Sequence, residues 1–127
     1  MSQGGRRPEV PKETMAKDPR ALLQQAEALR RSGRLSDAID ACLKALDTQP
    51  GLDALRVTLG RTYLESGQAD LARNTLQEVF DRLPEHHLAG KLLAEAQKET
   101  GDPAAAEATC QKLLQVYPRD REIEALL

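Results

Sequence analysis

The sequence has no tryptophan, two tyrosines and one phenylalanine, so aromatic side chains make up only 2% of its 127 residues. Valine and isoleucine are also scarce, with six in all, whereas leucine occurs 20 times and alanine 18 times. Strands favour β-branched and aromatic residues, while leucine and alanine are strong helix formers. The composition therefore argues against a sheet protein and predicts an all-α chain.

An excess of charge of one sign is also missing, because 18 Lys and Arg residues stand against 20 Asp and Glu residues. A nucleic-acid-binding face needs a concentration of basic side chains to displace counterions from phosphates. We therefore expect no nucleic-acid partner. No apolar run approaches the roughly 20 residues that a membrane-spanning helix requires, so we also expect no membrane insertion.

Residues 1–17 lack any apolar periodicity and contain Gly4, Gly5, Pro8 and Pro11. They are predicted to form a disordered leader, and no secretory signal follows the first basic residues. The absence of a signal favours a cytoplasmic location, an inference that fails if the chain is a fragment of a longer protein. Whether Met15 is an alternative start stays open.

An internal repeat of 34 residues organises the rest of the chain. Turn glycines recur at this spacing, and so do alanines, prolines, a second register of small residues and a register of bulky apolar residues: Gly33, Gly67, Gly101; Ala38, Ala72, Ala106; Pro50, Pro84, Pro118; Ala26, Gly60, Ala94; Leu46, Phe80, Leu114. Glycine permits the turn that ends a helix, and small residues allow two helices to pack closely. Each unit is therefore predicted to be two helices joined by a tight turn.

The expected helices cover residues 19–31, 36–48, 53–65, 69–82, 87–99 and 103–116. Asp18-Pro19 and Asp102-Pro103 combine an N-cap with a proline in the first turn, and Asp120 is expected to cap a seventh helix. The expected domain spans residues 19–127, with repeats at 19–52, 53–86 and 87–120. Residues 121–127 would begin a capping helix or a fourth repeat.

Repeat two carries Leu59-Gly60-x₂-Tyr63, followed by Ala72, Leu76 and Pro84. This pattern resembles the tetratricopeptide repeat, whose signature is W-x₂-L-G-x₂-Y…A-x₃-F…P. The resemblance implies a right-handed α-α superhelix that acts as a protein-interaction scaffold. The chain departs from the pattern at the tryptophan position, which holds Leu22, Arg56 and Gly90, and at Gln97, which replaces the aromatic residue. Gly90 is expected to make the helix at 87–99 the least stable one.

No set of residues points to catalysis, a cofactor or a metal. Cys42 and Cys110 share a register with Leu76, so they are expected to be buried core residues that lie too far apart for a disulfide. His86 and His87 lack the i, i+4 spacing of a helical metal pair, although a pH-sensitive junction stays open. We therefore expect a protein that is not an enzyme.

The resemblance implies that the first helices of successive repeats line a concave groove. The groove residues would then be Leu23, Gln24, Glu27 and Arg30 in repeat one, Val57, Thr58, Arg61, Leu64 and Glu65 in repeat two, and Leu88, Lys91, Leu92, Glu95 and Lys98 in repeat three. Chaperone-binding members share a clamp of Lys, Asn and Arg for a terminal carboxylate, and Leu23, Glu27 and Thr58 do not match it. An apolar line of Leu23, Val57 and Leu92 would instead accept a peptide, with Arg61 and Lys91 beside it for an acidic neighbour. Alternatively, these side chains simply fill the inside of the curve.

The primary hypothesis is therefore a scaffold that binds a peptide or partner protein in the concave groove. The alternatives are a self-associating structural segment, in which the apolar end at Leu126 and Leu127 forms a homo-oligomer, and a regulatory arm of a larger repeat protein. The sequence does not identify the partner or the pathway.

Overall fold

The computed structural model describes residues 18–127, so the predicted leader and Met15 lie outside the described residues. Within this range the chain forms helices and no strand. The helices are α2 (Pro19–Arg31), α3 (Leu35–Thr48), α4 (Asp53–Glu65), α5 (Ala69–Arg82), α6 (His87–Glu99), α7 (Pro103–Val116) and α8 (Arg121–Leu126). The all-helical prediction is confirmed. The expected bounds agree with the observed ones except at α3, which begins one residue earlier at Leu35.

Helix ends lie where the sequence predicts them. Asp18, Asp102 and Asp120 each cap a helix by accepting a backbone N–H with the side chain. Gly33, Gly67 and Gly101 follow the first helix of each repeat with φ values of 84°, 80° and 83°. A residue with a Cβ is strained in this region, so glycine is what allows each tight turn.

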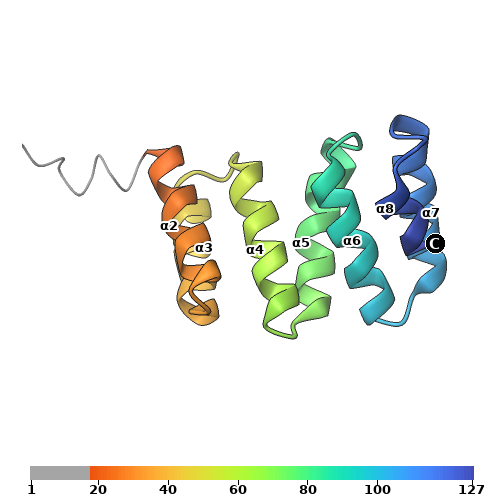
Figure 1. The fold of residues 1–127 in the computed structure, drawn as a ribbon. Helices are drawn as coiled ribbons and strands as arrows, with labels where there is room; N and C mark the ends of the chain where they lie inside the picture. The colour runs from red at the N-terminus through yellow and green to blue at the C-terminus, as the bar shows by residue number, and fades with distance from the viewer. Residues whose placement is uncertain (1–17) are drawn as a thin grey trace, which may run out of the picture.

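The helices stack in chain order into a solenoid, from α2 at one end to α7 and α8 at the other (Figure 1). Each helix packs against the next one along the chain. The first helices of the repeats also contact one another, α2 with α4 and α4 with α6, and α6 contacts α8 in the same way. Among the described residues, α3, α5 and α7 make no such contacts with each other. The first helices therefore lie on the inner side of the solenoid.

Small residues set how closely the two helices of a repeat approach. Ala38, Ala72 and Ala106 are fully buried, as the repeat register predicts. Gly60 lies against Leu76 so closely that a Cβ at position 60 would come within 2.5 Å of the Leu76 Cγ. Gly90 has the same relation to Leu113, where a Cβ would lie 2.7 Å from the Cδ1 atom. Helix α6 therefore continues through Gly90, and close packing is the physical reason for this glycine.

Candidate functional site

The candidate site is the inner face formed by α2, α4 and α6, and its predicted residues differ widely in exposure. Val57, Thr58 and Leu92 are buried, with exposed fractions of 5%, 3% and 7%. The side chains that are half-buried are Leu23, Glu27, Arg30, Arg61, Leu64 and Lys91. Gln24, Glu65, Leu88, Glu95 and Lys98 are exposed. Only part of the predicted set can therefore touch a partner.

The expected apolar line of Leu23, Val57 and Leu92 is not an exposed surface. Val57 and Leu92 belong to the hydrophobic core, and Leu23 packs against it. The prediction of an exposed line is wrong for Val57 and Leu92, because neighbouring first helices pack closely enough to bury both side chains. For these two residues the alternative, that they fill the inside of the curve, describes the structure. The exposed apolar surface of this face is instead Leu88, which is 38% exposed, and the smaller Ala54 at the equivalent position on α4.

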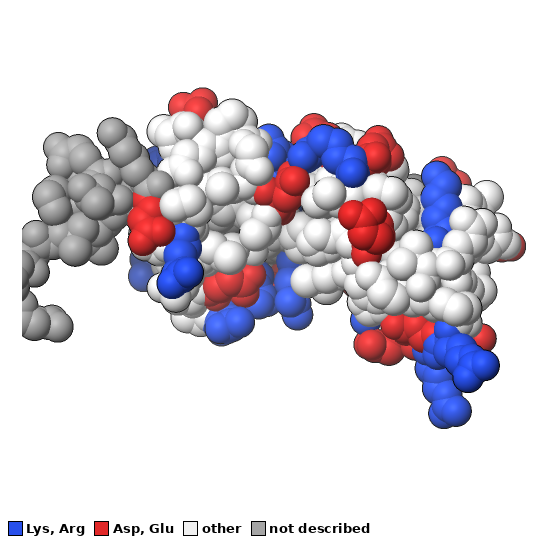
Figure 2. Space-filling model, turned by 90° about the horizontal axis from the view of Figure 1, so that it is seen from above, with Lys and Arg blue, Asp and Glu red and all other residues white. Residues whose placement is uncertain are grey.

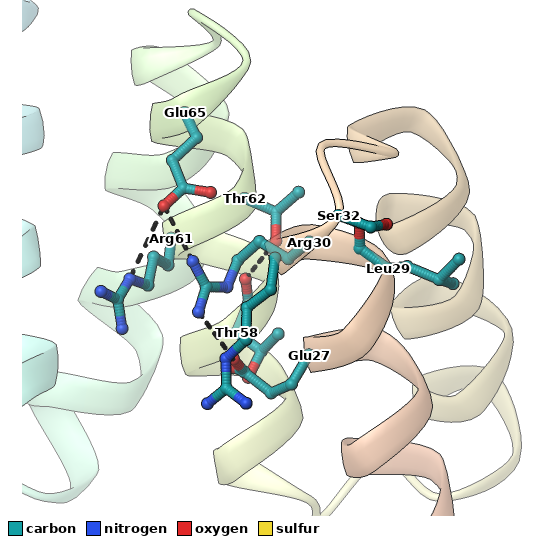
Figure 3. Close-up of polar contacts among 9 residues, drawn as sticks. Glu27, Leu29, Arg30, Ser32, Thr58, Arg61, Thr62 and Glu65 are labelled. Atoms are coloured by element: carbon teal, nitrogen blue, oxygen red, sulfur yellow. Dashed lines mark hydrogen bonds and ion pairs between the residues drawn. The ribbon is translucent and has the colours of Figure 1, made fainter.

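Charged side chains connect repeats one and two across the inner face (Figure 3). Arg30 lies between two carboxylates: its Nη2 donates to Glu27 at 2.7 Å and its Nη1 to Glu65 at 2.9 Å. The hydroxyl of Thr58 donates to the other oxygen of Glu27 at 2.7 Å. We call Arg31, Glu27, Arg30, Glu65 and Arg61, together with Thr58, the inter-repeat network.

The charges of the inter-repeat network alternate in sign. Arg31 flanks Glu27 at 3.7 Å and Arg61 flanks Glu65 at 3.8 Å, so both outer cations are held loosely. The Arg30 side chain, at the centre, is only 9% exposed. The Nε of Arg30 is a buried polar atom that makes no hydrogen bond.

The network also shifts the protonation equilibria of its members. Burial raises the pKa of Glu27, but the hydrogen bonds from Thr58 and Arg30 and the nearby positive charges outweigh it, so the pKa lies below 4.5. Burial lowers the pKa of Arg30, and its two carboxylate partners more than compensate, so that pKa is raised. Glu27 and Arg30 are therefore both charged at neutral pH.

A second polar cluster joins α6 to the α7–α8 turn. The Nε2 of His87 pairs with the Oδ2 of Asp120, and the His87 ring meets Tyr117 edge-on with centroids 4.9 Å apart. The Tyr117 hydroxyl donates to the carbonyl of Glu85 at 2.6 Å. Further along α6, Lys91 donates to Glu122 of α8 at 2.8 Å. Sequence spacing placed His87 at the start of a helix but did not predict its pairing with Asp120.

The structure shows what the remaining chemically reactive side chains do. Cys42 and Cys110 are both fully buried and unbonded, as their register predicts. Burial raises the pKa of the Cys42 thiol to about 12, so this thiol stays protonated and unreactive. His86 caps α6 by accepting the N–H of Ala89 with its Nδ1. Within residues 18–127, no three His, Cys, Asp or Glu side chains lie close enough to hold a metal ion.

Figure 2 looks down on one long side of the solenoid, where charges of both signs are interspersed around broad uncharged areas. No single-sign patch dominates that view. Among the described helices, none is long and apolar enough to cross a bilayer.

The tetratricopeptide-repeat family model matches residues 29–92 and again residues 72–127. This chain belongs to the tetratricopeptide-repeat family. No curated protein matches it in sequence. The tetratricopeptide-repeat resemblance drawn from Leu59, Gly60, Tyr63, Ala72 and Pro84 is thereby confirmed.

Solved tetratricopeptide-repeat structures share the fold. The first TPR of Spaghetti (RPAP3) bound to the HSP90 peptide SRMEEVD superposes with a TM-score of 0.80 at 15% identity, covering 87% of each chain. The Sgt2 TPR domain from Aspergillus fumigatus gives 0.79 at 20% identity, over 93% of this chain and 80% of that one. MamA 41-end from Desulfovibrio magneticus RS-1 gives 0.77 at 24% identity. The match covers 84% of this chain and 60% of the MamA chain.

Proposed function

We propose that this protein is a non-catalytic scaffold that binds a peptide or partner protein on the inner face of its solenoid. The family fold supports this proposal, since one similar structure is a TPR bound to a peptide. The observation that carries it is the exposed apolar side chain of Leu88 on the inner face. Together with the exposed Ala54 on α4 and the half-buried Leu23 on α2, this side chain gives the inner face apolar surface that a partner could bury.

Inner-face residues are positioned to act together because the first helices contact one another. Leu23, Ala54 and Leu88 lie in the N-terminal halves of α2, α4 and α6. The charged members of the inter-repeat network lie in the C-terminal halves of α2 and α4, next to them. The proposed surface therefore has one half with exposed apolar side chains, which also carries the Lys91–Glu122 pair, and one charged half. A partner segment that spans the repeats would contact both halves.

The substitution Leu88→Glu tests the proposal, because it puts a charge at the exposed apolar contact point without disturbing the core. Leu43→Glu on α3 is the matched control, since Leu43 is 46% exposed and lies on a second helix. We expect affinity capture with Leu88→Glu to lose the partners that the wild type and Leu43→Glu both recover. Recovery of the same partners by both variants would show that the inner face is not the binding surface.

Substitution at Val57 or Leu92 would be a poor test, although both are predicted groove residues. Each is buried in the core, so a glutamate there would unfold the protein rather than remove a contact. The circular dichroism spectrum of Leu88→Glu should match that of the wild type, which separates lost binding from lost structure.

A further inference from the structure

Arg30, Arg61 and Lys91 of the inner face are already paired with carboxylates of this chain. Arg30 contacts Glu27 and Glu65, and Arg61 lies beside Glu65. In repeat three, Lys91 is bound by Glu122 of α8 and its side chain is only 17% exposed. A partner carboxylate that binds Arg30 or Lys91 would compete with these internal acids.

The remaining charges of this face also balance each other. Glu95 and Lys98 lie one turn apart on α6 with opposite signs, and both are exposed. Arg31 is 73% exposed, but its nearest carboxylate, Glu27, is only 3.7 Å away. The field over the inner face therefore has no dominant sign, and it offers neither an acidic nor a basic ligand a strong attraction.

Covering the ion pairs would also cost free energy, because charges that are removed from water lose their hydration. A partner therefore gains most by leaving the inter-repeat network hydrated and burying apolar surface over the other half of the face. The side chains that offer such surface are Leu88, Ala54 and the exposed part of Leu23.

We propose that the inner face recognises an uncharged, apolar stretch of its partner, and that this recognition requires neither an acidic side chain nor a free carboxyl terminus. This inference rests on the proposed function and specifies the chemistry of the ligand. It separates this protein from a binder of an acidic peptide such as SRMEEVD, the ligand in the similar Spaghetti (RPAP3) structure. An affinity that depends on apolar contacts is insensitive to salt, whereas one that depends on charge is screened.

Random peptides displayed on phage, selected against the whole chain, provide the probe. We expect the selected peptides to be rich in apolar residues and poor in Asp and Glu. Fluorescence anisotropy should then give an affinity that changes by less than about twofold between about 50 and about 500 mM NaCl. Synthetic SRMEEVD should not compete. Selection of acidic peptides, a tenfold or greater loss of affinity in salt, or competition by SRMEEVD would overturn the inference.

Variants separate this inference from the proposed function. Leu88→Glu should weaken the selected peptides at least about tenfold, a loss on the scale of one buried apolar side chain, while Leu43→Glu should not. The double substitution Lys91→Gln with Glu122→Gln removes a cation and its internal partner together, and affinity should change by less than about twofold. A loss of affinity in this double variant would overturn the apolar inference and leave the proposed function intact. If no peptide binds, or if Leu88→Glu and Leu43→Glu bind alike, the proposed function fails as well.

Discussion

Equivalent positions on the two helices of each repeat carry residues of complementary size. Repeat two combines the smallest residue, Gly60, with the large Leu76 that lies against it. Repeats one and three have a larger residue at the first position and a smaller one at the second: Ala26 with Cys42, and Ala94 with Cys110. All of these except the glycine have exposed fractions of 0%. The two cysteines therefore fill the space that leucine fills in repeat two.

This complementarity predicts that Gly60→Ala destabilises the protein, by up to about 2 kcal/mol. Overpacking against Leu76 costs about 1 to 3 kcal/mol, and better helix propensity returns about 1 kcal/mol at most. Adding Leu76→Cys should restore part of the loss, since it recreates the pair of the other repeats. A double-mutant cycle from urea unfolding measures this coupling.

Gly51→Ala is the matched control for Gly60→Ala, because nothing lies within 4 Å of a Cβ at position 51. It should leave the free energy of unfolding within about 0.5 kcal/mol of the wild type. If Gly60→Ala behaves like Gly51→Ala, the packing argument is wrong.

The inter-repeat network predicts a pH dependence of stability. The pKa of Glu27 is lower in the folded protein than its ordinary value of 4.5. Its contribution is therefore fully present above pH 4.5 and is lost as the pH falls through the folded pKa. Glu27→Gln should lower the free energy of unfolding by about 1 to 2 kcal/mol at neutral pH, because it removes the charge-assisted hydrogen bonds that Glu27 accepts from Arg30 and Thr58. Urea unfolding over a pH series should show this difference shrink in acid, whereas a difference that stays constant would contradict the prediction.

The sequence predicts which residues turn the chain, but it does not predict which charged side chains of the inner face pair with each other. The spacing of Gly33, Gly67 and Gly101 predicts the turns because a turn depends on one local conformation. The bond between Arg30 and Glu65 joins side chains 35 positions apart, and its existence depends on the rotamers of both. The burial of Val57 likewise depends on the distance between neighbouring helices, which no local pattern encodes.

Helix ends differ among the repeats although their positions coincide. Helices α3, α5 and α7 begin at equivalent residues, after Arg34, Gln68 and Asp102. Only Asp102 accepts a backbone N–H with its side chain, from Ala105 at 3.0 Å. The helix bounds could be predicted because a fixed repeat length transfers each boundary to the next unit. The side-chain cap at Asp102 could be predicted from its residue type, whereas the one that His86 makes on α6 could not.

We therefore expect Gln68→Asp to stabilise the protein by about 0.5 to 1 kcal/mol, since aspartate is a preferred N-cap and its charge is favourable at a helix N-terminus. The side chain of Gln68 now donates only to Ser66 at the surface, so little is lost. Gln68→Ala is the control and should not raise the thermal midpoint. An equal midpoint for Gln68→Asp and Gln68→Ala would show that position 68 does not cap α5.

Helix α2 differs from α4 and α6 on the side where another helix would pack. Leu59 and Leu93 occupy equivalent positions on α4 and α6 and are almost fully buried. The same position on α2 is Gln25, which is exposed. Ala28, also exposed, corresponds to the buried Thr62 and Ala96. Gln25 therefore puts a polar side chain where α4 and α6 have a buried leucine.

This difference predicts that Gln25→Leu promotes association between molecules, because it creates at α2 the apolar position that α4 and α6 bury against a neighbouring helix. Sedimentation velocity over a range of concentrations should show a larger oligomeric fraction than in the wild type. Gln24→Leu is the control, since it adds the same apolar surface one position away, on the inner face. Equal association of both variants would mean that added hydrophobicity alone is responsible. If the oligomeric fraction of Gln25→Leu equals that of the wild type, position 25 does not control stacking at this end of the solenoid.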